Sequence, residues 1–156
     1  MTAAASIIAA LAAMGLTFGT AFVGSRFPVD DWYAGLTKPA WNPPNWLFAP
    51  VWTALYLLMA IAAWLVWRES GFSGAAVPLA VFVLQLILNA GWSWIFFGRH
   101  EIRLALIEIV ILWLAILWTV LAFWRVSPVA GALLVPYLLW VSFASVLNYA
   151  IWRLNR

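Results

Sequence analysis

Five long apolar runs divide the chain, and short polar segments separate them. The runs cover about residues 2–24, 46–67, 76–97, 102–124 and 129–152. Each is close to the ~20 residues that an α-helix needs to cross a bilayer. Apolar residues are continuous within each run rather than alternating, which excludes a transmembrane β-barrel. The pattern therefore predicts an all-α membrane protein, a five-transmembrane-helix bundle that forms a single domain over residues 1–156.

The longest interruption between these runs is aromatic and rich in proline. Residues 32–46 contain three tryptophans, one tyrosine and three prolines, namely Pro39, Pro43 and Pro44. Proline lacks the backbone N–H donor and turns the preceding residue away from the helical conformation, so this segment does not span the membrane. Its aromatic content is too high for a passive linker. We expect a structured lid, a long first loop that caps an intramembrane pocket.

Composition identifies the solvent that surrounds the fold. Hydrophobic residues make up 67% of the 156 residues and charged residues only 8%, whereas a soluble domain carries about 25% charged residues. The lipid bilayer is therefore the expected partner of the outer surface. The absence of cysteine excludes disulfides, thiolate metal sites and cysteine nucleophiles. The net charge is +3 and its cations flank the apolar runs, so we expect no nucleic-acid partner.

The distribution of lysine and arginine predicts the orientation of the helices. One side of the membrane would carry only Arg68 and Arg125. By the positive-inside rule, the first loop and the C-terminus lie on the cytoplasmic side and the N-terminus lies outside. We expect a bacterial cell membrane, with the inner and the outer membrane as alternatives. The cations on the cytoplasmic side would be Arg26, Lys38, Arg99, Arg103, Arg153 and Arg156.

Small residues and tryptophans add detail to individual helices. Gly15 and Gly19 form a Gly-x-x-x-Gly pattern, which favours close packing either against a neighbouring helix of the same chain or against a second copy in a homodimer. Tryptophans near the ends of the runs are typical of an aromatic belt at the headgroup level. Other tryptophans lie deeper and need another explanation: Trp52, Trp92, Trp94, Trp113, Trp118 and Trp140.

Polar side chains within the apolar runs indicate either function or helix association, because they are costly in lipid. Three runs carry polar and aromatic residues at helical spacing: Trp52 and Tyr56 on the second, Gln85, Asn89, Trp92 and Ser93 on the third, and Tyr137, Trp140, Ala144, Leu147 and Asn148 on the fifth. Residues spaced by three or four positions share one helix face. These faces would enclose an aromatic and mostly apolar cavity. Ordinary helix packing explains the same periodicity equally well.

Groups for classical catalysis are scarce in this sequence. Glu108 is the one acid well inside an apolar run, and we expect it to reach the membrane interface or to pair with an arginine. His100, the only histidine, lies among charged residues of a loop and is expected to be solvated rather than to bind a metal or haem. The sequence has no Ser-His-Asp set, no carboxylate pair and no glycine-rich phosphate loop. We expect no metal site and no cofactor.

Several motifs together resemble one known family. They are Trp32-Tyr33, Lys38-Pro39-x-Trp41-Asn42-Pro43-Pro44, Trp52-Thr53-x-x-Tyr56, Asn89-x-x-Trp92, Val126-Ser127-Pro128, Pro136-Tyr137-x-x-Trp140 and Leu147-Asn148-Tyr149. The chain resembles the TspO family of tryptophan-rich sensory proteins and translocator proteins, also called peripheral benzodiazepine receptors, as a bacterial-type member. The resemblance covers nearly the whole chain. It implies five transmembrane helices, usually in a homodimer, with a long first loop over a pocket in the bundle.

The resemblance also implies a function. Such proteins bind or sense porphyrins, such as protoporphyrin IX and haem, and other hydrophobic small molecules, such as sterols and benzodiazepine-site drugs, in tetrapyrrole regulation or transport. Light-dependent porphyrin degradation by Trp52 and Trp140 is one alternative, and transport of porphyrin or sterol across the membrane is another. We expect binding rather than enzymatic activity as the main role.

Site residues follow from the resemblance motif by motif. The ligand-binding residues would be Tyr33, Pro43, Phe48, Trp52, Tyr56, Asn89, Trp92, Trp140, Ala144 and Leu147. Near the C-terminus, Leu147, Tyr149 and Arg153 match a weak pattern proposed for sterol contact. A bacterial host that lacks sterols would put that sterol role in doubt, although the pattern itself is intact.

Overall fold

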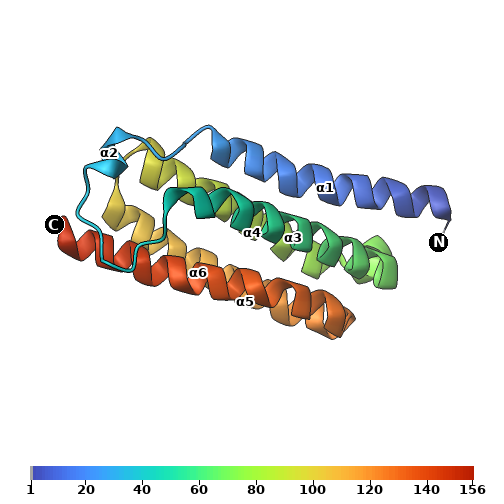
Figure 1. The fold of residues 1–156 in the computed structure, drawn as a ribbon. Helices are drawn as coiled ribbons and strands as arrows, with labels where there is room; N and C mark the ends of the chain where they lie inside the picture. The colour runs from blue at the N-terminus through green and yellow to red at the C-terminus, as the bar shows by residue number, and fades with distance from the viewer. Residues whose placement is uncertain (1) are drawn as a thin grey trace.

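The computed structural model describes residues 2–156 and shows a bundle of long helices that run side by side (Figure 1). These helices are α1 (Ala3–Ser25), α3 (Asn45–Gly74), α4 (Ala76–Ser93) with its π-helical continuation η1 (Trp94–Gly98), α5 (Ile102–Val126) and α6 (Pro128–Leu154). Residues 2–156 contain no β-strand. The structure has five helices long and apolar enough to cross a membrane, so the predicted all-α bundle of five spanning helices is confirmed.

The loop between α1 and α3 contains a short helix that the sequence did not predict, α2 (Asp31–Ala34). We call residues 26–44 the lid. The lid and the C-terminus lie at one end of the bundle, and the N-terminus lies at the other end (Figure 1). Because successive helices alternate in direction, the connection between η1 and α5 also lies at the lid end. The cytoplasmic location of this end remains a prediction.

The second spanning helix ends later than expected. The sequence predicted an end near residue 67, but the helix continues through Arg68 and Glu69, and its first non-helical residue is Gly71, with φ +63°. Positive φ suits glycine because it has no Cβ. Arg68 lies 5.3 Å from the centre of the Trp64 ring, so this charged residue is accommodated on the helix surface. Polarity alone therefore did not interrupt the helix, whereas Gly71 kinks it before its last residues, 72–74.

Helices α5 and α6 form a tight hairpin around a single extended residue. Ser127, with φ −148° and ψ 114°, caps α6 through its side chain, which accepts a hydrogen bond from the backbone N–H of Ala130 at 3.3 Å. Pro128 occupies the first turn of α6, where a missing N–H costs nothing. A Cβ atom at Gly131 would lie 2.8 Å from Trp124 and 2.9 Å from its backbone. The hairpin therefore requires glycine at position 131.

Helix α1 is the least buried of the spanning helices. Only Ala13 and Thr17 of α1 are buried, while α3, α4, α5 and α6 supply the rest of the main apolar core. Gly15 and Gly19 are exposed, and a Cβ atom added at either would meet nothing within 4 Å. Close packing of this glycine pair against a helix of the same chain, one of the two interpretations above, is therefore wrong. The homodimer remains a prediction.

We predict that Gly131→Ala destabilises the protein by about 1–3 kcal/mol, the usual cost of overpacking a tight contact. The added methyl group would push α6 away from the backbone of α5 at Trp124. Thermal unfolding of the detergent-purified protein, followed by circular dichroism, measures the change. Gly15→Ala is the matched control, because its methyl group points into open space and should leave the midpoint unchanged or higher. Equal midpoints for both variants would contradict the assigned packing.

Candidate functional site

A cavity of about 420 Å³ lies inside the bundle below the lid. Its walls come from α1, α3, α4 with η1, α5 and α6, and Phe27, Pro28, Val29 and Tyr33 of the lid complete it. The lining is mostly aromatic and aliphatic, and no charged residue in the described part of the chain contributes to it. Small-molecule sites typically occupy about 300–1,000 Å³ and combine apolar walls with a few polar groups. The cavity has the size and the character of such a site.

Most of the ligand-binding residues that the resemblance implied meet in this cavity. Pro43 is the exception, because it is absent from the lining and its carbonyl oxygen instead accepts a hydrogen bond from the side-chain amide of Asn42 at 3.3 Å. The residues that do line the cavity are Tyr33, Phe48, Trp52, Tyr56, Asn89, Trp92, Trp140, Ala144 and Leu147. Side chains from the lid and from three spanning helices thus converge on one space.

A chain of buried hydrogen bonds joins α3, α4 and α6 beside the cavity. The Tyr56 hydroxyl donates to Asn89 Oδ1 at 2.7 Å, and Asn89 Nδ2 donates to the Tyr137 hydroxyl oxygen at 2.9 Å. The Tyr137 hydroxyl in turn donates to Gln85 Oε1 at 2.7 Å. The predicted polar faces are therefore used in part for helix association. Tyr56 and Asn89 also line the cavity, so the two interpretations of these faces hold together.

A second polar contact fixes the wall of the cavity near the lid. Trp92 Nε1 donates to Asn148 Oδ1 at 3.0 Å, and Asn148 Nδ2 donates to the backbone carbonyl of Ile102 at 3.2 Å. These two bonds connect α4, α6 and the start of α5. Because Asn148 uses both ends of its amide, the orientation of the Trp92 ring against the cavity is determined by the bundle itself.

The aromatic walls are arranged edge to face. Trp52 and Trp140 have ring centroids 6.5 Å apart at an interplanar angle of 88°. Tyr56 lies 5.6 Å from Trp52, and Phe48 lies 6.1 Å from Trp140. Tilted and edge-to-face pairs are the favourable geometries of aromatic rings. Both tryptophans line the cavity, so two indoles at nearly a right angle form this part of its wall.

The other deep tryptophans do not belong to the cavity. Trp94 and Trp118 are 47% and 54% exposed on the outer surface of the bundle, where lipid would cover them. Trp113 donates from Nε1 to the Ser142 hydroxyl at 2.7 Å and joins α5 to α6. The position of a tryptophan along its helix therefore does not tell whether it faces the cavity or the lipid. The helix face on which it lies does.

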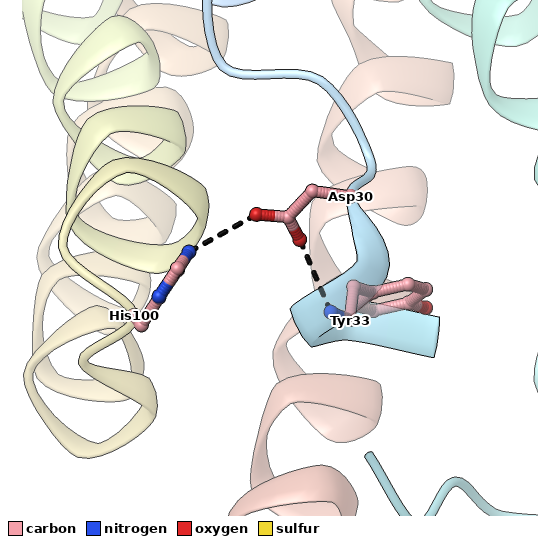
Figure 2. A network of polar contacts seen from close by, with 3 residues as sticks. All are labelled: Asp30, Tyr33 and His100. Carbon is pink, nitrogen blue, oxygen red and sulfur yellow. Dashed lines mark hydrogen bonds and ion pairs between the residues drawn. The ribbon is translucent and has the colours of Figure 1, made fainter. Parts of the chain in front are cut away.

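The lid contributes Tyr33, whose side chain is only 3% exposed. Asp30 caps α2, since its Oδ1 accepts the backbone N–H of Tyr33 at 3.1 Å (Figure 2). Lys38 closes the other end of α2 by donating to the carbonyl of Tyr33 at 2.8 Å and that of Leu36 at 3.0 Å. Burial raises the pKa of the Tyr33 hydroxyl, so this group stays neutral and donates to Asn42 Oδ1 at 3.2 Å.

Several lining residues were not predicted from the sequence. They are mainly apolar positions of α1, the start of the lid, η1 and α5: Phe18, Ala21, Gly24, Phe27, Pro28, Val29, Phe96, Phe97, Ile109 and Leu112. Nothing local distinguishes such residues from those that face lipid. The aromatic pair Phe96-Phe97 carried the clearest available signal, because both lie in the same helical run as Asn89 and Trp92.

Glu108 behaves differently from the expectation. Both carboxyl oxygens are buried, and neither has a hydrogen-bond partner among residues 2–156, so interfacial exposure and an arginine pair are both wrong. The reason is a gap in the neighbouring helix, since a Cβ atom at Gly91 would lie only 3.3 Å from Oε1. The glycine lets the side chain pack against α4 instead of extending to the membrane surface. Glu108 does not line the cavity.

The residues of the sterol pattern point to different sides of α6. Leu147 is buried and lines the cavity, whereas Tyr149 is 45% exposed. The guanidinium carbon of Arg153 lies 6.0 Å from the centre of the Tyr149 ring. Tyr149 and Arg153 thus form an outer surface pair, and Leu147 belongs to the interior. The three residues do not make one contact surface.

Comparison with known proteins relates the chain to one family. The model of the TspO/MBR family matches residues 6–153. The tryptophan-rich protein TspO of Chlorobaculum tepidum is 47% identical over 91% of this chain and 92% of its own. The human translocator protein is 45% identical over 92% of this chain and 89% of its own. The tryptophan-rich sensory protein of Cereibacter sphaeroides is 40% identical over 86% and 84%, respectively.

These relatives and the five apolar spanning helices make the chain a multi-pass integral membrane protein. The family match covers nearly the whole length of the chain, including every element that lines the cavity. The protein belongs to the TspO/MBR family.

Proposed function

We propose that this protein binds porphyrins, such as protoporphyrin IX and haem, within the membrane and acts as their sensor or carrier. The observation that carries this proposal is a lidded cavity of about 420 Å³ with aromatic walls and no charged lining residue among residues 2–156. A planar, largely apolar macrocycle matches such walls. Relatives that carry the names translocator protein and tryptophan-rich sensory protein are consistent with a role in sensing or moving a ligand.

Affinity in this site would come mainly from the aromatic residues. Trp52 and Trp140 meet at 6.5 Å, so a ring system can stack on one indole and contact the edge of the other, and such contacts are worth about 0.5–1.5 kcal/mol each. The polar lining groups Tyr56, Asn89 and Asn148 already form hydrogen bonds with one another, with Trp92 or with the backbone. They would orient the ligand rather than supply most of its binding energy.

Sterols and benzodiazepine-site drugs are further ligands that an apolar cavity of this kind would accept. The polar chain at its side offers few free donors, which limits discrimination among hydrophobic molecules of similar size. A direct titration with a porphyrin and with a sterol ranks the two classes. We expect the porphyrin to bind more tightly because the lining is predominantly aromatic.

We predict that Trp52→Phe and Trp140→Phe each weaken binding of protoporphyrin IX by about three- to tenfold, the equivalent of one lost aromatic contact. Quenching of tryptophan fluorescence during titration of the purified protein measures the dissociation constant. Trp113→Phe is the matched control, because Trp113 pairs with Ser142 outside the cavity. Unchanged affinity in both cavity variants, or an equal loss in the control, would rule out this site.

Light-dependent degradation of the bound porphyrin is a second candidate function, which the closeness of the Trp52 and Trp140 rings favours. An indole in contact with a photoexcited macrocycle can donate an electron to it. We predict that illumination with oxygen present yields a new product faster than protein-free photobleaching does, and that Trp52→Phe slows its formation. Chromatography of the illuminated mixture measures it. Product formation at the protein-free rate would leave binding as the sole function.

A further inference from the structure

A contact between the lid and the loop after η1 combines a carboxylate, an imidazole and an indole. His100 Nε2 lies 3.1 Å from Asp30 Oδ2, and the His100 ring stacks on Trp32 with centroids 4.1 Å apart and planes 11° from parallel. Figure 2 shows His100 facing Asp30 across the gap between the two segments. We call Asp30, Trp32 and His100 the lid clasp.

The backbone holds His100 in an uncommon conformation. Its φ is +58°, in the left-handed region that glycine adopts freely and that, among other residues, asparagine, aspartate and histidine adopt most often. The neighbouring amides are fixed on η1, since the N–H of Arg99 donates to the Trp94 carbonyl at 2.8 Å and that of Glu101 to the Ile95 carbonyl at 3.1 Å. The imidazole is thereby directed at the lid by the same π-helical turn that supplies Phe96 and Phe97 to the cavity.

Asp30 connects the clasp to the ligand site. One carboxylate oxygen contacts His100, and the other accepts the backbone N–H of Tyr33 at 3.1 Å (Figure 2). Tyr33 lines the cavity and packs on Phe96 and Phe97, with ring centroids at 6.2 Å and 5.5 Å. A change in the clasp therefore acts on the residue with which the lid reaches the cavity.

We propose that the lid clasp is a pH-sensitive fastening, in which protonation of His100 tightens the lid over the cavity and slows ligand exchange. Asp30 and His100 are positioning residues for Tyr33. The part of this proposal that concerns ligand exchange rests on the binding function proposed above, whereas the part that concerns lid closure does not.

The sign of the effect follows from the charges in the clasp. The hydrogen bond from the Tyr33 N–H, and after it the contact with His100, lowers the pKa of Asp30. The ionised Asp30 carboxylate therefore stabilises the closed lid above the ordinary carboxyl range, and this contribution is lost only as pH falls through the lowered pKa. Histidine is the side chain that ordinarily changes charge between pH 5 and 8. An imidazolium would gain an ion pair with Asp30 and a cation–π contact with Trp32. Acidification within this range therefore closes the lid.

The remaining charged groups of these segments leave this sign unchanged. In the lid, the ammonium group of Lys38 is held by backbone carbonyls at and just after the end of α2 and Arg26 is an exposed cation, so both would oppose protonation of His100 only weakly through water. Asp31, next to Asp30 in the lid, would also favour a protonated His100. Arg99 and Glu101 flank His100 in sequence and bind each other at 3.1 Å, so their charges offset one another. Arg103 follows on α5 as an exposed cation and would oppose protonation only weakly through water.

A second attachment of the lid does not depend on pH. The side-chain amide of Asn155 on the C-terminal side of α6 accepts the backbone N–H of Thr37 at 2.9 Å and donates to the Thr37 carbonyl at 2.7 Å. Neither group titrates between pH 5 and 8. The lid is thus held by one fastening that responds to pH and one that does not, which provides an internal control.

The test measures the mobility of the lid in the absence of any ligand. Because the chain has no cysteine, Ala34→Cys on the exposed side of α2 accepts a single nitroxide label, in discs of neutral phosphatidylcholine. We predict that the mobile fraction of the label decreases about two- to fivefold between about pH 8 and about pH 5.5, the size expected for one exposed ion pair. Asp30→Asn keeps the cap on α2 and His100→Asn tolerates the positive φ, and each should abolish the response.

Two control variants and a ligand measurement complete the experiment. Glu101→Gln, which removes a neighbouring carboxylate, should keep the pH response, and Asn155→Ala should loosen the lid at both pH values and also keep it. A wild-type label whose mobility is constant, or an Asp30→Asn variant that responds like the wild type, would overturn the proposal. The dissociation rate of protoporphyrin IX is then compared between wild type and His100→Asn at each pH, which cancels the titration of the ligand. A responsive lid without porphyrin binding would refute the binding function alone.

Discussion

A chain of hydrogen bonds from Tyr56 through Asn89 and Tyr137 to Gln85 determines how α3, α4 and α6 meet. In a bilayer a polar group without a hydrogen-bond partner is costly, so hydrogen bonds among these side chains are strongly favoured. Each such bond adds only about 0.6 kcal/mol, and its main effect is on register. A shift of one residue along any of the three helices would separate donor from acceptor. The cavity is built against this chain, and it keeps its shape for that reason.

This constraint also explains which part of the site the sequence could predict. Polar residues in an apolar run must face inward, and helical spacing then identifies their neighbours on the same face. Asn89 and Trp92 on α4, and Trp140, Ala144 and Leu147 on α6, were found in this way or by motif, and all line the cavity. The polar residues in the interior of α1 and α5, such as Thr17 and Glu108, do not line the cavity and so do not mark its walls. The lining residues of these two helices are mainly apolar, and an apolar residue that faces a cavity has the same local sequence pattern as one that faces lipid.

The lid is held by contacts that local sequence patterns do not predict. Its prolines and aromatic residues predicted an ordered loop, and the order is present as a short helix with a cap at each end. The partner of Asp30 is 70 residues away at His100, and the partner of Thr37 is 118 residues away at Asn155. No periodicity connects such positions. The same limit applies to Glu108, whose location depends on the absence of a side chain at Gly91 of the neighbouring helix.

Charged groups are kept apart from the cavity in this molecule. Within residues 2–156 the cavity lining is uncharged, while the lid that covers it is held by a carboxylate, an imidazole and an ammonium group at the water-exposed end. Contacts of this kind are individually weak in water, so the lid can open without disturbing the bundle. Substitutions in the aromatic walls should then change how tightly a ligand binds, and changes in the clasp should alter how fast it enters and leaves. Under the proposed binding function, access would depend on charged groups in water, whereas affinity would depend on aromatic groups inside the bundle.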